Sequence, residues 1–213
     1  MQVCCAGEVM VELAAVDADG RYQLGFAGDS YNTAVYLARA GLAVNYLTRL
    51  GDDDLSRQIL GRLAAEGIGT DRVTLCHGRR PGLYLIDNDA DGERRFSYWR
   101  GEAPARELFA EPVRLADVDV FYFTGITLAV TRDGIEQLLV TLEGLAAQGC
   151  RTVFDPNYRP ALWDSVDQAR DYTARVLPFC HTVMPTMDDE RQLWQHTNPA
   201  QVAGFYRGHG AVE

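Results

Sequence analysis

Residues 152–163 read TVFDPNYRPALW, and this stretch indicates the class of fold more clearly than any other. It opens with a short run that predicts a buried strand ending at Asp155. Two prolines, Pro156 and Pro160, then restrict the backbone of a polar turn that carries Asn157 and Arg159. A turn that fixes polar side chains directly after a buried strand is more often shaped for a ligand than for a connection.

The same unit, a compact strand followed by a helix, recurs on both sides of this stretch. Strands are expected at residues 44–50, 119–124, 152–155 and 182–184. Helices are expected at residues 30–40, 55–66, 132–148 and 166–176. We expect Ser30 or Asp29 to cap the first of these helices, and Gly41 and Gly67 to end the first two. The alternation predicts an α/β fold, a doubly wound and mostly parallel sheet with helices on both faces.

Two segments, about 8–26 and 80–100, do not follow this alternation. In the first, strands at 9–13 and 21–26 flank a turn at 17–20. A strand at this point argues against a dinucleotide-binding start, which needs a glycine-rich turn and a helix.

The second of these segments predicts a hairpin. Its strands are residues 83–87 and 94–99, joined by the polar turn 88–92. We expect both segments to form a small β lid over one edge of the sheet, within a single domain that covers residues 1–213.

The composition excludes several kinds of chemistry. All 20 basic residues are arginine, so lysine-dependent phosphate loops, Schiff-base aldolases and pyridoxal enzymes are excluded. Arginine suits two-pronged recognition of phosphate or carboxylate. The formal net charge of −10 at pH 7 disfavours nucleic acid and anionic membranes as partners.

The cysteines and histidines suggest no metal or disulfide chemistry. The five cysteines are scattered without CxxC spacing, and we expect most of them to be buried apolar residues. The four histidines share no helix face at ligand spacing, and we assign them no function. No stretch is apolar for long enough to span a membrane, and the N-terminus has no basic leader, so we expect a cytoplasmic protein.

The first strong helix is preceded by polar and glycine residues that suit a ligand. Gly28, Asp29 and Asn32 lie at its N-terminus, where backbone amides and the helix dipole point outward. Asp29 and Asn32 together offer donors and acceptors for sugar hydroxyls. A capped helix behind a flexible loop explains the same residues, and from them alone that alternative is slightly favoured.

The hairpin carries an aromatic and basic face. Phe96, Tyr98 and Arg100 share one face by alternation, and Tyr84 stands on the partner strand. A cross-strand cluster that only stabilises the ribbon is a strong alternative. Five arginines nevertheless gather here in an acidic protein, which is consistent with closure over an anionic substrate: Arg79, Arg80, Arg94, Arg95 and Arg100.

Two features concern the last part of the chain. Residues 186–190 place Asp189 and Glu190 in the first turn of a helix, which dipole compensation explains well and an indirect hold on Mg²⁺ explains less simply. A helix at 199–207 should lead to another core strand, but only a few residues follow it. We therefore expect the chain to be the first two thirds of a larger α/β unit.

Taken together, these segments resemble the ribokinase-like carbohydrate kinases of the phosphofructokinase B type, and within them the 2-keto-3-deoxygluconate kinases. The matching stretches run in order along the chain: GEVMVEL (7–13), GFAGDSYNTAVYLAR (25–39), RPGLYLI (80–86), GERRFSYWR (92–100), TGITL (124–128) and TVFDPNYRPALW (152–163). The resemblance implies an ATP-binding α/β domain and a lid that closes over the sugar and often contributes to a dimer.

The resemblance also implies roles for individual residues. Sugar hydroxyls would be held by Gly28, Asp29 and Asn32. The pocket would be lined by Tyr84 and Tyr98, and Arg100 would contact the acidic group of the sugar. Asn157 and Arg159 would lie between the sugar and the ATP phosphates. Thr186 would lie near the nucleotide, and Asp189 or Glu190 would provide the acid linked to Mg²⁺.

The implied reaction is transfer of the ATP γ-phosphoryl group to the terminal C6 hydroxyl of 2-keto-3-deoxygluconate, with Arg159 as a supporting catalytic residue. The sequence departs from the family pattern at Ala27 and Thr186, and the motif with the family's catalytic Asp would lie beyond Glu213. We therefore expect this polypeptide alone to be nearly inactive. Two alternatives remain open: a fructokinase or another kinase of this family, and a truncated sugar-binding protein without catalysis.

Overall fold

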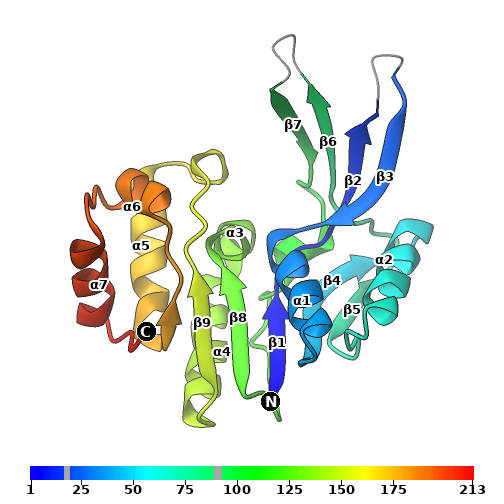
Figure 1. Cartoon of the computed structure of the whole chain (residues 1–213). Coiled ribbons are helices and arrows are strands. Elements are labelled where there is room, and N and C mark those ends of the chain that lie inside the picture. The colour runs from blue at the N-terminus through cyan, green and yellow to red at the C-terminus, as the bar shows by residue number, and fades with distance from the viewer. Residues whose placement is uncertain (17–19, 89–92) are drawn as a thin grey trace.

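A computed structural model describes residues 1–16, 20–88 and 93–213, and it contains two β-sheets (Figure 1). The larger sheet has six strands in the order β10-β9-β8-β1-β4-β5, and every neighbouring pair is parallel. Its strands are β1 (Gln2–Ala6), β4 (Ala43–Gly51), β5 (Val73–Cys76), β8 (Val120–Thr124), β9 (Arg151–Asp155) and β10 (Thr182–Val183). The parallel sheet expected from the alternating strands and helices is confirmed.

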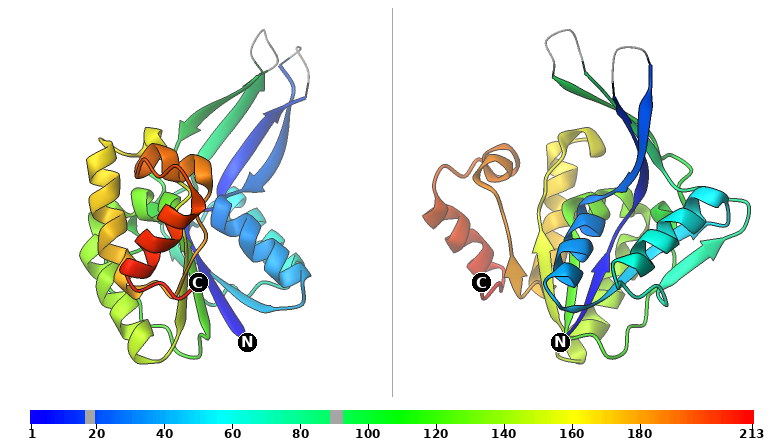
Figure 2. Two further views of the ribbon diagram at one scale, coloured as in Figure 1. Left: turned by 60° about the vertical axis from the view of Figure 1, so that its left-hand side comes forward. Right: turned by 45° about the vertical axis from the view of Figure 1, so that its right-hand side comes forward.

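Helices cover both faces of this sheet because its strands bury side chains on both sides (Figure 2). In β1, Val3 and Cys5 join the apolar cluster under α1 (Asp29–Arg39) and α2 (Asp54–Ala65). Cys4 and Ala6 point to the opposite cluster. That cluster is covered by α4 (Ile135–Ala147), α5 (Val166–Val176) and α7 (Pro199–Gly208). Four of the five cysteines are buried, and all five are free thiols.

The second sheet has four strands in the order β3-β2-β6-β7 and projects from the carboxyl edge of the first (Figure 1). Its strands are β2 (Met10–Ala15), β3 (Tyr22–Ala27), β6 (Leu83–Asn88) and β7 (Arg94–Trp99). Two antiparallel pairs are joined by the parallel pair β2 and β6, so segments about seventy residues apart share one sheet. Most of the turns expected at 17–20 and 88–92 lies outside the described residues.

Three details differ from the expectations. The N-cap of α1 is Gly28 without a side-chain cap, because the Asp29 carboxylate and the Ser30 hydroxyl bond elsewhere. The helix expected from residue 132 starts with a 3-10 turn, Arg132–Gly134, before α4. The helix α3 (Gly125–Val130) and the strand β5 were not anticipated, since six and four residues are too short to show a period.

The remaining helices complete the molecule. α6 (Met187–Leu193) follows β10, and short 3-10 turns occur at Pro104–Glu107, Pro160–Leu162 and Leu177–Phe179. Among the described residues, no helix combines the length and the apolar character that crossing a membrane requires.

Candidate functional site

A cleft of about 480 Å³ lies between the second sheet and the carboxyl edge of the parallel sheet. Eight of the residues to which the sequence analysis gave a ligand role line it: Gly28, Asp29, Asn32, Tyr84, Tyr98, Arg100, Asn157 and Arg159. They come from α1, from the hairpin β6–β7 and from the turn after β9. Carboxyl ends of parallel strands are the usual place for ligand sites in such sheets.

The N-terminus of α1 approaches the backbone of the segment between β1 and β2 very closely. A Cβ atom at Gly28 would lie 2.2 Å from the carbonyl oxygen of Glu8, so only glycine fits there. The Gly28 carbonyl accepts the first helical hydrogen bond from Asn32 N–H at 2.8 Å. This contact therefore places the first turn of α1 at the floor of the cleft.

Asp29 joins three segments that are distant in the sequence. Its carboxylate accepts hydrogen bonds from the Thr124 hydroxyl at 2.5 Å and from the Asn157 side-chain amide at 3.1 Å. Thr124 ends β8 and also caps α3. The carboxylate is thus held in place, with the side-chain amide of Asn157 beside it.

The turn after β9 has a constrained backbone. Asn157 adopts φ 33°, and its N–H donates to the Asp155 carboxylate at 3.1 Å. Burial raises the pKa of Asp155, with smaller contributions from the carboxylates of Asp29 and Asp189, while the Asn157 N–H opposes the shift. A Cβ atom at Gly125 would lie 1.9 Å from the Pro156 carbonyl oxygen, so the turn packs tightly on α3.

Aromatic rings form one wall of the cleft. Tyr84 is buried, and its ring centroid lies 5.7 Å from that of Tyr98 and 6.3 Å from that of Phe96. The Tyr84 hydroxyl donates to Glu12, and burial together with this carboxylate raises the pKa of Tyr84. Tyr98 and Phe96 are about half exposed, so their faces are available to a ligand.

At the base of the hairpin, Arg100 forms a buried ion pair with Glu8. Its guanidinium group also lies 5.8 Å from the centre of the Tyr98 ring. Both Arg100 and Glu8 line the cleft. Glu8 was not singled out in the sequence, because nothing local to it indicates an ionic partner 92 residues away.

Arg159 is the more accessible arginine of the cleft. Its side chain is half exposed, donates to the Tyr158 carbonyl at 3.0 Å and lies 3.6 Å from the Asp189 carboxylate. Asp189 is not among the residues that line the cleft, but it pairs with Arg159, which does line it. Thr186 caps α6 by accepting from Asp189 N–H at 3.2 Å.

Glu190 lies apart from the cleft. It is fully buried, accepts a hydrogen bond from the Tyr206 hydroxyl and lies 2.7 Å from His196 Nδ1. Both of its carboxylate oxygens therefore have partners between α6 and α7. No group of three or more acidic, histidine or cysteine side chains suited to a metal occurs among residues 1–16, 20–88 and 93–213.

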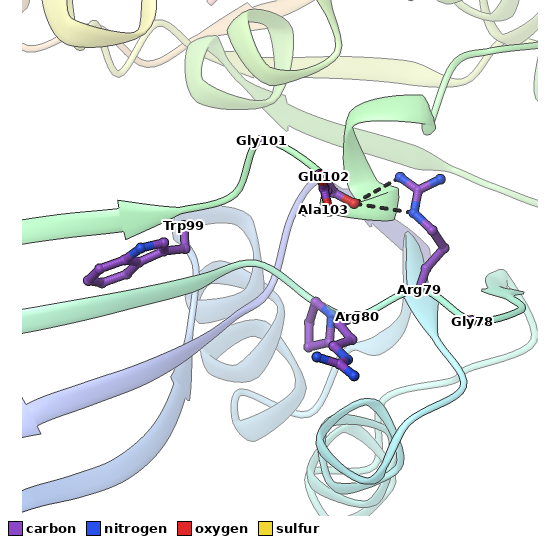
Figure 3. Close-up of a pocket in the computed structure, with 8 residues that line it drawn as sticks. Gly78, Arg79, Arg80, Trp99, Gly101, Glu102 and Ala103 are labelled. Atoms are coloured by element: carbon purple, nitrogen blue, oxygen red, sulfur yellow. Dashed lines mark hydrogen bonds between the residues drawn. The ribbon is translucent and has the colours of Figure 1, made fainter.

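Of the five arginines that gather in this part of the sequence, only Arg100 lines the cleft. Arg79 and Arg80 line a separate hollow of about 440 Å³ beside Trp99 (Figure 3). There Arg79 donates to the Glu102 carbonyl at 2.8 Å and pairs with Glu107.

The chain matches the model of the pfkB family carbohydrate kinases over residues 1–208. It belongs to this family. The resemblance to carbohydrate kinases of the phosphofructokinase B type is thus confirmed. A pfkB family protein from Polaromonas sp. JS666 has a similar structure, with a TM-score of 0.89 at 29% identity over 99% of this chain and 74% of that one.

Several curated relatives of this pfkB family chain are named 2-dehydro-3-deoxygluconokinase. That of Haemophilus influenzae is 39% identical over 91% of this chain and 65% of its own length, and that of Dickeya dadantii is 36% identical over 99% and 71%. This chain thus spans about two thirds of their length. The 2-dehydro-3-deoxygluconokinase of Thermotoga maritima shares the fold, with a TM-score of 0.88 at 23% identity over 99% of this chain and 69% of that one.

Proposed function

We propose that this protein transfers the γ-phosphoryl group of ATP to the terminal C6 hydroxyl of 2-keto-3-deoxygluconate. The observation that supports this most directly is the composition of the cleft. The residues that line it include polar groups at the start of α1, aromatic rings of the hairpin, and the two arginines Arg100 and Arg159. The relatives named 2-dehydro-3-deoxygluconokinase support the same substrate.

We propose that different residues of the cleft bind different groups of the sugar. Gly28, Asp29 and Asn32 hold sugar hydroxyls, since a fixed carboxylate and an exposed amide offer acceptors and donors together. Tyr84 and Tyr98 cover the carbon chain of the sugar. Arg100 meets its carboxylate, for which a guanidinium group has matching geometry.

We propose that Asn157, Arg159 and Thr186 face the phosphates of ATP. Phosphoryl transfer depends chiefly on alignment and on neutralising charge, and a half-exposed guanidinium can approach an anion with little loss of hydration. The Arg159 guanidinium group and the Asn157 side-chain amide, which both line the cleft, are donors that suit a phosphate, and Thr186 lies at the start of α6 beside Asp189. When bound, ATP would supply the transferred phosphoryl group, and Arg159 would stabilise the negative charge that develops on this group during transfer.

A magnesium ion would be held at this site mainly by Asp189, with water molecules between the carboxylate and the ion. Magnesium in kinases is commonly held by one or two carboxylates together with substrate phosphates. The Asp189 carboxylate lies 3.6 Å from Arg159, whereas both Glu190 oxygens already have partners. We therefore propose Asp189, rather than Glu190, as the acid linked to the metal.

We also propose that the second sheet acts as a lid and that its outer face joins two copies of the protein. The face opposite Tyr84 and Tyr98 carries Leu13, Leu24 and Leu85 side by side in the sheet register. Leu24 is exposed, and such apolar faces commonly mark protein contacts. A kinase that uses ATP and a sugar acid suits the cytoplasm.

Calorimetry with the chain and two sugars tests the substrate. We expect 2-keto-3-deoxygluconate to bind more tightly than fructose. Arg100→Ala should weaken the binding of the acidic sugar by on the order of tenfold or more and should change the binding of fructose little. If Arg100→Ala weakened the binding of both sugars equally, a fructokinase would be favoured. Sugar binding without ATP binding would favour a binding protein, and an assay of phosphoryl transfer with the same chain tests the expectation that it is nearly inactive alone.

A further inference from the structure

The ion pair between Glu8 and Arg100 is the most deeply buried pair of an arginine with a carboxylate in the described part of the chain. The Glu8 side chain is 3% exposed and that of Arg100 is 11% exposed. Glu8 lies between β1 and β2, and Arg100 directly follows β7. Removing two charges from water is costly and needs close, well-oriented partners, so such a pair calls for a reason beyond general stability.

The surroundings hold this pair in one arrangement. Arg100 Nη2 donates to Glu8 Oε2, and the Tyr98 ring lies on another side of the guanidinium group. A Cβ atom at Gly82 would lie 2.6 Å from Glu8 Oε1 and 3.2 Å from Arg100 Cβ. The glycine at 82 therefore leaves the space that the pair occupies.

The pair still has unused hydrogen-bonding capacity. Glu8 Oε1 and Arg100 Nε are buried without a partner in the described structure. A guanidinium group has five N–H donors, and Glu8 takes only one of them in the contacts described. Arg100 can therefore donate hydrogen bonds to a second carboxylate, from a ligand in the cleft, while Glu8 keeps it oriented.

We propose that Glu8 is a positioning residue that holds Arg100 against the cleft wall, and that the preference for an acidic sugar depends on it. The inference rests on the proposed function, because it assumes that Arg100 meets the sugar carboxylate. Without Glu8, the long arginine side chain would have to be ordered by the ligand itself, which lowers affinity. Glu8 needs no contact with the ligand for this effect.

A purely structural role is the competing explanation, since the pair also ties the end of β1 to the end of β7. Such a role would change stability but would affect acidic and neutral sugars equally. The ratio of the two affinities therefore separates the two explanations.

The test compares Glu8→Ala, Arg100→Ala and the double variant, with binding of 2-keto-3-deoxygluconate and of fructose measured by calorimetry. We expect Glu8→Ala to weaken the binding of 2-keto-3-deoxygluconate by on the order of tenfold to a hundredfold and to change the binding of fructose little. The double variant should bind the acid no more weakly than Arg100→Ala alone, because both changes remove the same interaction. Glu66→Ala is the matched control, since it removes the exposed ion pair with Arg39 at the end of α2.

Two further variants keep the test decisive if Glu8→Ala does not fold. Glu8→Asp keeps the charge but shortens the reach, and Gly82→Ala crowds the pair without changing any charge. Both should lower the preference for the acid, with circular dichroism confirming the fold. An unchanged preference in these variants, or additive losses in the double variant, would overturn the inference.

The outcomes also separate this inference from the proposed function. If Arg100→Ala removes the preference for the acid and the Glu8 variants do not, only the role of Glu8 is wrong. If the unchanged chain shows no preference for the acid and Arg100→Ala changes nothing, the proposed substrate is wrong, and the role of Glu8 with it.

Discussion

At the scale of single residues, the cleft is arranged around carboxylates whose neighbours fix their direction. Asp29 accepts from Thr124 and Asn157, and Asp155 accepts from the N–H of Asn157. Asn157 therefore connects two acids that repel each other, and it does so from a backbone conformation that asparagine tolerates better than most residues. Repulsion between fixed carboxylates lowers the stability of the fold, and such destabilising arrangements are typical of sites whose geometry serves a ligand.

The raised pKa of Asp155 gives a prediction for stability against pH. In the folded chain the Asp155 carboxyl holds its proton more tightly than in the unfolded chain, where its pKa is the ordinary 3.8. As pH rises from that value through the raised folded pKa, Asp155 therefore lowers the free energy of unfolding. Asp155→Asn removes this dependence and keeps an acceptor for Asn157 N–H. We expect the variant to be more stable than the wild type at neutral pH, and the difference to shrink as pH falls through the folded pKa.

Urea unfolding from about pH 4 to about pH 8 measures this difference. Asp188→Asn is the control, because that side chain is exposed and pairs with Arg191 along α6. A variant Asp155→Asn that is less stable than the wild type at neutral pH would contradict the prediction.

The residues of the cleft could be predicted from the sequence only where the signal is local. Gly28, Asp29 and Asn32 stand together at the start of a helix, and Asn157 and Arg159 share one turn, so short local stretches made them candidates and the family resemblance gave them roles. Glu8 has no such signal, since its role depends on an arginine that only the pairing of β2 with β6 brings near.

At the scale of elements, the position of α1 depends on one close backbone contact. A Cβ atom at Gly28 would meet the Glu8 carbonyl oxygen at 2.2 Å, and a backbone atom cannot move aside as a flexible side chain can. We expect Gly28→Ala to lower the free energy of unfolding by roughly 1–3 kcal/mol and to abolish sugar binding, because the first turn of α1 must shift. Thermal unfolding and calorimetry measure the two effects.

Gly61→Ala provides the matched control within the same fold. Gly61 lies inside α2, where an added Cβ meets no atom within 4 Å. The change should raise stability by about 0.5–1 kcal/mol, since alanine favours a helix interior over glycine, and should leave sugar binding unchanged. The explanation for α1 would be wrong if Gly28→Ala behaved like this control.

Elements with a clear period were predictable, and those without one were not. The helix α5 has the bounds expected from its apolar spacing, and the strands of the hairpin match within one residue. The edge strand β5 has partly exposed side chains, and α3 is buried along almost its whole length, so neither shows an amphipathic pattern.

At the scale of the whole molecule, the second sheet has two apolar faces, but the parallel sheet lies on one side only. The inner face carries the cleft wall around Tyr84, whereas the register puts Leu13, Leu24 and Leu85 on the outer face. In the part of the chain that the structure describes, no helix packs over that face (Figure 2). The sequence shows the hairpins but not the parallel pairing of β2 with β6, which turns two ribbons into one surface. An open sheet of this kind is stabilised by covering its second face.

If the outer face joins two copies, a charge placed on it should separate them. We expect the wild type to form a dimer and Leu24→Asp to yield a monomer that keeps its fold, because each buried aspartate would lose hydration without gaining a partner. Leu75→Asp is the control, since Leu75 is equally an exposed leucine but lies on the edge strand β5 of the other sheet. Size-exclusion chromatography with light scattering gives the masses. A wild type that stays monomeric at all concentrations, or a Leu24→Asp variant that stays dimeric, would show that another surface or none joins the copies.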